Sequence, residues 1–147
     1  MLTHHDVIEG ARVLDLFAGT GALGFEALSR GAASVCFVEN GRSGQRLIGE
    51  NMRKLDAAAD TQLLRHDATR LGPWAQAAFD LVFLDPPYGK SMGQKALAAA
   101  AEGGWLTPGA MVVWEESAPM QAPEGFARID TRKYGDTHVT LLERATN

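Results

Sequence analysis

The residues best suited to chemistry are Asp85-Pro86-Pro87-Tyr88, which directly follow a short apolar run, Leu81–Leu84. The run is rich in strand-forming residues and is typical of a strand buried on both faces. Because prolines cannot donate to a sheet ladder, we expect the strand to end at Asp85. A carboxylate, free backbone carbonyls and an aromatic ring therefore meet at the carboxyl end of a strand, where open α/β sheets bind ligands.

This arrangement suits a planar substrate that carries an NH2 group. The ring of Tyr88 could stack on the plane, while Asp85 and a proline carbonyl accept hydrogen bonds from the amine. The alternative is an ordinary strand followed by a turn, in which Asp85 caps a local backbone group. The motif alone leaves both interpretations open.

A glycine-rich turn lies nearer the start of the chain, between a predicted strand (11–17) and a predicted helix (22–30). Its sequence, Gly19-Thr20-Gly21-Ala22-Leu23-Gly24, matches the pattern G-x-G-x-x-G. Glycine lets the backbone turn sharply and approach a ligand closely. The pattern fits a nicotinamide dinucleotide, a flavin, or an adenosyl cofactor without phosphates.

Three acids favour the adenosyl cofactor. Asp15 lies inside the first strand, where it would repel a pyrophosphate but could bind the ammonium of an amino-acid tail. Glu39 ends the second strand, where a carboxylate can accept from both ribose hydroxyls. Asp67 follows the third strand, where an acid can accept from the adenine amino group. Structural alternatives are a hydrogen bond that orients the loop for Asp15 and a helix cap for Asp67.

The elements that must position these residues alternate between strand and helix and close with an antiparallel pair. The expected strands are 11–17, 34–39, 61–66, the strand ending at Asp85, 110–115, 126–133 and 137–143, and the expected helices are 22–30, 43–55, 70–78 and 93–102. Alternation implies an α/β fold with a parallel, doubly wound sheet and right-handed crossovers. The closing hairpin departs from the common dinucleotide-binding halves. Because side chains alternate between the two faces of a strand, we expect Arg128 and Arg132 in the first strand of this hairpin to share a face.

Composition narrows the class of protein. The length of 147 residues predicts one domain, and 46% hydrophobic with 22% charged residues is ordinary for a globular protein. The net charge of −4 argues against strong nonspecific nucleic-acid binding but allows a local basic face. Without a membrane-length apolar run or a signal peptide, we expect a cytoplasmic protein. The single cysteine, Cys36, excludes an internal disulfide, and the four histidines show no metal-ligand spacing.

Two segments together resemble a known family. They are DLFAGTGALGFEALSRGA (15–32) and LDPPY (84–88). They resemble the bacterial 16S rRNA (guanine-N2)-methyltransferases, which use S-adenosylmethionine. The resemblance covers nearly the whole chain and implies a Rossmann-like class I methyltransferase fold, with a mostly parallel seven-stranded sheet and a C-terminal antiparallel hairpin. Residues 1–147 would form one domain, truncated at its N-terminus, because the family begins with a further segment that bears threonine and arginine.

The resemblance also implies a set of site residues. The catalytic loop would be Asp85, Pro86, Pro87 and Tyr88, and the cofactor would be held by Asp15, Phe17, Gly19, Thr20, Gly21, Glu39, Asn40, Asp67, Ala68 and Asp85. Asp15 and the glycines would line the methionine end of the cofactor. Glu39 would hold the ribose, and Asp67 and Ala68 the adenine. The family usually has an acid where this chain has Asn40.

The implied reaction is methyl transfer to the exocyclic N2 of a guanine in 16S rRNA, free or in the small ribosomal subunit. The enzyme would act as a monomer without a metal or membrane, and its candidate RNA contacts are Lys90, Arg128, Arg132 and Lys133. Three alternatives stay open. They are an amino-methyltransferase for DNA adenine or a protein amide, a nicotinamide oxidoreductase, and a non-catalytic RNA-binding assembly module.

Overall fold

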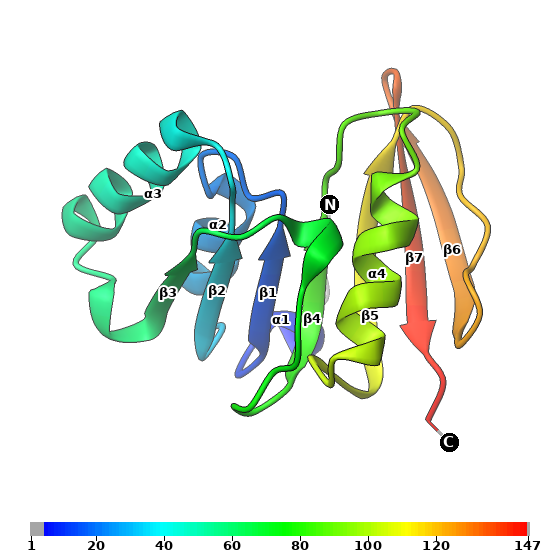
Figure 1. Cartoon of the computed structure of the whole chain (residues 1–147), viewed down its shortest axis with the longest axis horizontal. Helices are drawn as coiled ribbons and strands as arrows, with labels where there is room; N and C mark the ends of the chain where they lie inside the picture. Colours follow the sequence, from blue (N-terminus) through cyan, green and yellow to red (C-terminus); the bar gives the residue numbers. More distant parts are fainter. Residues whose placement is uncertain (1–4, 147) are drawn as a thin grey trace.

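A seven-stranded sheet forms the centre of the molecule, with its strands in the order β3-β2-β1-β4-β5-β7-β6 (Figure 1). The computed structural model describes residues 5–146. The strands are β1 (Arg12–Leu16), β2 (Ser34–Val38), β3 (Thr61–Leu64), β4 (Phe79–Leu84), β5 (Leu106–Glu116), β6 (Phe126–Tyr134) and β7 (Thr137–Arg144). The helices are α1 (His5–Ile8), α2 (Ala22–Ser29), α3 (Arg42–Lys54) and α4 (Met92–Glu102), with the 3-10 turns η1 (Ala58–Asp60) and η2 (Ala68–Arg70). Strands β1 to β5 are parallel, and β7 runs antiparallel to β5 and β6, which confirms the predicted fold class.

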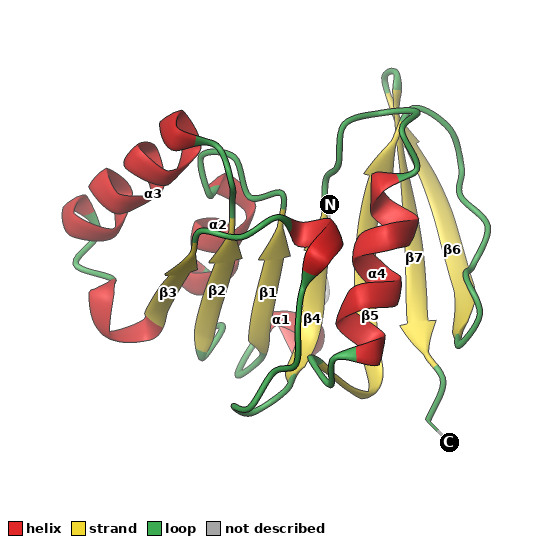
Figure 2. Ribbon diagram, viewed as in Figure 1, coloured by secondary structure: helices red, strands yellow, loops and turns green. Residues whose placement is uncertain are grey.

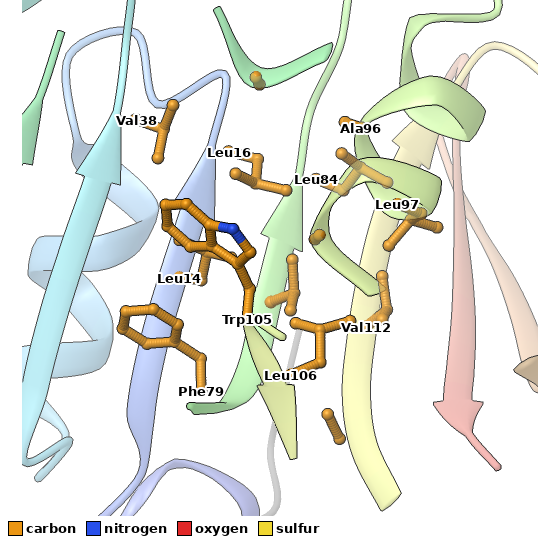
Figure 3. Packing of buried hydrophobic residues seen from close by; sticks show 14 of the residues in the cluster. Leu14, Leu16, Val38, Phe79, Leu84, Ala96, Leu97, Trp105, Leu106 and Val112 are labelled. Atoms are coloured by element: carbon orange, nitrogen blue, oxygen red, sulfur yellow. The ribbon is translucent and has the colours of Figure 1, made fainter. Parts of the chain in front are cut away.

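Apolar side chains fill both faces of the sheet, because helices cover both. Figure 2 shows α4 in front of the sheet and α1 and α2 behind it. On the α4 face, Leu14 and Leu84 pack with Leu97 and Trp105 (Figure 3). The opposite face has a second cluster, which includes residues of α2 and α3. Burial on both faces explains why the central strands read as nearly continuous apolar runs. Within residues 5–146, no helix has the length and apolar character needed to span a bilayer.

The helix predicted over 70–78 is wrong. The chain forms only the turn η2 there and then continues as a loop. Pro73 lacks an N–H donor and disfavours a helical residue before it. The apolar residues of the segment pack from the loop instead, since Trp74 stacks on Trp105 with 4.2 Å between ring centroids. The short helix α1 falls in a stretch for which the sequence predicted no element.

The predicted common face of the two hairpin arginines is also wrong. Between Arg128, which is opposite Leu142, and Asp130, which is opposite Leu141, the register shifts by one residue. Such a bulge moves the following side chains to the other face of the sheet. Arg128 and Arg132 therefore lie on opposite faces, so the hairpin does not present them together to a single ligand.

Replacing Leu97 in α4 with alanine should lower the free energy of unfolding by about 2–5 kcal/mol, because it leaves a cavity in the core. Leu97 is 0% exposed, whereas Leu55, which serves as the matched control, is 59% exposed. Leu55→Ala should change the free energy by less than about 0.5 kcal/mol. Urea denaturation measures both. Equal effects of the two substitutions would contradict the described core.

Candidate functional site

The predicted site residues follow strands whose carboxyl ends lie level at one edge of the sheet, which is the upper edge in Figure 1. Leu16 at the end of β1 pairs with Val38 of β2 and with Leu84 of β4, and Val38 pairs in turn with Leu64 of β3. The segments after these strands carry the glycine-rich turn, Glu39, Asp67 and Asp85. The topology therefore brings the sequence-predicted residues to one edge.

Asp15 is buried beneath the first turn of α2, with 1% of its surface exposed. Its Oδ2 accepts a hydrogen bond from the backbone N–H of Gly24 at 3.1 Å. A Cβ at Gly24 would lie only 2.4 Å from Phe37 and 3.0 Å from Asp15, so this close contact requires glycine. The hydrogen bond that orients the loop, given as an alternative from sequence, is thus present. Burial raises the pKa of Asp15 well above its usual value, and nearby carboxylates raise it further.

Gly19 is half-buried at the bend of the turn and has a positive φ of 60°. Its N–H donates to Oε1 of Glu39 at 2.8 Å. No atom lies within 4 Å of the position that a Cβ would take, so the backbone faces open space. Thr20 is exposed beside it and Gly21 is buried, while Phe17 packs partly against the core. The turn leaves a backbone surface that a ligand can approach closely.

Glu39 connects the turn to the start of α3. Oε1 accepts from Gly19 and Oε2 accepts from the N–H of Gly41 at 3.0 Å. A carboxylate has about four acceptor positions, so two remain for ribose hydroxyls. Asn40 is exposed beside it. Glu39 is therefore both a structural residue and one that can still bind a ligand.

Asp67 caps the turn η2. Its Oδ1 accepts from the N–H of Thr69 at 2.9 Å and from the Thr69 hydroxyl at 2.7 Å. The hydrogen bonds from Thr69 lower the pKa of Asp67. The side chain of Ala68 is buried in the core. The cap that sequence gave as an alternative is present, so Ala68 can offer a ligand only its backbone.

The loop after β4 has a buried Pro86 between Asp85, whose side chain is partly exposed, and the exposed Pro87. The Tyr88 hydroxyl lies 3.3 Å from the Thr137 hydroxyl on β7, and Tyr88 remains 45% exposed. This contact ties the loop to the closing hairpin. Partial burial raises the pKa of Asp85, while a side-chain hydrogen bond with Glu115 opposes that shift. The loop thus combines an anionic acceptor with an accessible aromatic ring.

Sequence reasoning missed two residues at this edge. Glu115 follows Trp114, which pairs with Leu84, so it reaches the same edge as Asp85. Its position near the end of a predicted strand was the signal that could have revealed it. Gly44 in α3 allows the helix to approach the turn, because a Cβ there would lie 2.6 Å from the carbonyl oxygen of Gly19. Among the described residues, no three His, Cys, Asp or Glu side chains are grouped as metal ligands would be.

The molecule has a parallel sheet that ends in an antiparallel pair of strands, and a glycine-rich turn follows the first strand. These features define a class I methyltransferase architecture. Residues 1–143 match the family described as Conserved hypothetical protein 95, and the chain belongs to that family. The chain is 32% identical over 141 residues to ribosomal RNA small subunit methyltransferase D of Haemophilus influenzae, covering 92% of this chain and 73% of that protein. The family resemblance that the motifs indicated is confirmed.

Further relatives agree. The Escherichia coli K12 protein named ribosomal RNA small subunit methyltransferase D is 31% identical over 117 residues, which are 80% of this chain and 59% of that protein. The solved structure of a candidate methylase from Haemophilus influenzae superposes with a TM-score of 0.86 at 29% identity, covering 96% of this chain and 91% of that chain.

The stability of Asp15→Asn should depend on pH differently from that of the wild type. Because the folded pKa of Asp15 is raised, its contribution to stability is full below the unfolded pKa of about 3.9 and is lost as pH rises through the folded pKa. Asparagine has the same shape and does not ionise. The free energy of unfolding of Asp15→Asn should therefore rise relative to that of the wild type as pH increases from the unfolded pKa to the folded pKa of Asp15.

Urea denaturation from pH 4 upward measures the difference between the two proteins. The exposed Asp60 supplies a control, Asp60→Asn, for loss of one surface charge. If the difference in free energy of unfolding between Asp15→Asn and the wild type stays constant with pH, the buried charge of Asp15 is not unfavourable and the account is contradicted.

Proposed function

We propose that this protein methylates the exocyclic N2 of a guanine in 16S rRNA, using S-adenosylmethionine. The observation that carries the proposal is the group of carboxyls beside the open turn at Gly19. The names of the relatives, which are ribosomal RNA small subunit methyltransferases, support the substrate class. The loop Asp85-Pro86-Pro87-Tyr88 supports an amino group as the target.

The charge of this edge favours a cationic cofactor. The carboxyls of Asp85, Glu39 and Glu115 all act on the buried Asp15 to raise its pKa. A positively charged ligand would relieve this repulsion, whereas a pyrophosphate would add to it. S-adenosylmethionine carries a sulfonium and an ammonium group, so it fits better than a nicotinamide dinucleotide. When bound, it supplies a methyl group activated for transfer to a nucleophile.

Each part of the cofactor has candidate contacts along the edge. The open backbone at Gly19, with Phe17, Thr20 and Gly21 of the same turn, would receive the methionine end beside Asp15. The unused acceptor positions of Glu39 would take the ribose hydroxyls, with Asn40 beside them. The free oxygen of Asp67 and the backbone of Ala68 would contact the adenine.

Asp85 and Pro86 would orient the target amine. The nitrogen is a poor nucleophile, since its lone pair is delocalised into the purine ring. Its two N–H groups would donate to the Asp85 carboxylate and the Pro86 carbonyl, which aims the lone pair along the line of transfer. Asp85 also offsets the positive charge that grows on the nitrogen and can accept its extra proton.

Tyr88 would hold the target base. A guanine taken out of its stack could lie on this ring, a contact worth about 1–3 kcal/mol. The hydrogen bond to Thr137 fixes the hydroxyl end of Tyr88 and leaves the side chain partly exposed. Lys90, which is exposed two residues later, would meet a phosphate of the same RNA strand.

Asp85→Ala should lower methyl transfer by about a hundredfold or more, because it removes charge stabilisation and one acceptor. Cofactor affinity should stay within a few-fold. The assay incubates labelled S-adenosylmethionine with separate RNA, DNA and protein fractions, and nucleoside digestion identifies the product. Label as N2-methylguanosine in small-subunit rRNA is the expected result. Label confined to DNA or protein, or unchanged turnover of Asp85→Ala, would refute the proposal.

Glu39→Ala should weaken cofactor binding at least about tenfold, since hydrogen bonds to a charged group contribute roughly 1.5–3 kcal/mol. Calorimetric titration with the demethylated product of the cofactor measures the dissociation constant. Glu124→Ala, at an exposed residue far along the chain, is the control for charge. Wild-type affinity in Glu39→Ala would remove Glu39 from the site.

A further inference from the structure

Glu115 lies next to Asp85 because β4 and β5 run in register. Leu84, the last residue of β4, pairs with Trp114, so Asp85 lies level with Glu115, which is still within β5. The carboxyl groups of Asp85 and Glu115 lie close enough for a hydrogen bond to affect the pKa of each. On its other side Glu115 pairs with Val139 of β7, which offers no charge. Of the two residues beside Glu115 on the neighbouring strands, Asp85 is therefore the polar one.

A hydrogen bond between two carboxyl groups requires a proton on one of them, because ionised carboxylates only accept. The causes of the two pKa shifts indicate which group carries it. Burial raises the pKa of both groups. The hydrogen bond with Glu115 opposes that rise at Asp85, whereas the charge of Asp85 and the same hydrogen bond add to it at Glu115. The contact therefore favours the protonated form of Glu115 and the ionised form of Asp85.

The surroundings reinforce this arrangement. Burial raises the pKa of Asp15 on β1, and Asp15 also lies close enough to Asp85, Glu39 and an ionised Glu115 for their charges to raise it further. The adjacent Glu116 is buried on the other face, where it accepts from the Trp114 indole at 3.3 Å. Among the described residues, no salt bridge joins Lys or Arg to Asp85 or Glu115. A shared proton would reduce the mutual repulsion of the pair.

We propose that Glu115 is a positioning residue, which donates its proton in a hydrogen bond to Asp85 and holds that carboxylate toward the target amine. This inference rests on the proposed function and adds a residue to it. Glu115 keeps its proton throughout and does not touch the substrate. Asp85 stays free to accept from the amine through its remaining lone pairs.

The first test compares two substitutions of Glu115 in the methyl-transfer assay. Glu115→Gln keeps a donor for Asp85 and should retain kcat within a few-fold. Glu115→Ala removes the donor and should lower kcat about ten- to a hundredfold, because small misplacements of a catalytic group are costly. The KM for S-adenosylmethionine should change little in either variant. Glu124→Gln, at an exposed residue, controls for a general effect of a Glu-to-Gln substitution.

The pH profile separates positioning from a purely structural role. In the wild type, kcat should fall as pH rises through the pKa of Glu115, since loss of its proton places two negative charges side by side. Glu115→Gln cannot lose a proton there, so this alkaline fall should disappear. An alkaline fall that persists in Glu115→Gln, or an unchanged kcat in Glu115→Ala, would overturn the proposal.

Carboxyl 13C NMR of the free protein tests the pair without any methyl transfer. Asp85→Ala removes both the charge and the hydrogen-bond acceptor by which Asp85 raises the pKa of Glu115, so that pKa should fall. The exposed Glu124 serves as the internal reference. An unchanged Glu115 titration would overturn the shared proton. If the pKa falls as expected but the wild type methylates no RNA, the proposed function fails while the contact stands.

Discussion

The site depends on the register of adjacent parallel strands, which places the acids near their carboxyl ends side by side at one edge of the sheet. Leu84, the last residue of β4, lies between Leu16, the last residue of β1, and Trp114, which lies two residues before the end of β5. Asp15, Asp85 and Glu115 therefore share one edge, where partial or full burial raises the pKa of each. A cluster of three carboxyl groups is stable only if bound protons or a bound cation reduce the repulsion between their negative charges. A cationic methyl donor meets this electrostatic requirement.

Tight packing around glycine keeps that edge in place. Gly24 brings α2 against β1 and β2 and supplies the N–H that holds Asp15, while Gly44 brings α3 against the turn. Glu39 then joins the turn to α3 through two backbone hydrogen bonds. Because these contacts come from different strands and helices, the open backbone at Gly19 is positioned before any ligand arrives, which lowers the cost of binding.

The sequence predicted those features that depend on local chemistry. Proline after Asp85 ends a strand whatever its neighbours are, and the alternation of strands and helices implies a parallel sheet. The features it missed depend on the neighbours. Trp74 packs on Trp105 from a loop where the apolar pattern suggested a helix, and the bulge near Arg128 appears only in the pairing with β7. The contact of Asp85 with Glu115 required knowing that β4 and β5 are adjacent.

Amide NMR during titration with S-adenosylmethionine tests the central claim most directly, namely that this edge binds a cationic methyl donor. We expect saturable shifts at Gly19, at Gly41 beside Glu39 and at Ala68, with little change at Ile129 on the distant part of the hairpin. NADH should produce no comparable shifts, since its pyrophosphate would face the carboxyl group cluster. Shifts confined to another part of the molecule, or a response to NADH alone, would contradict the account.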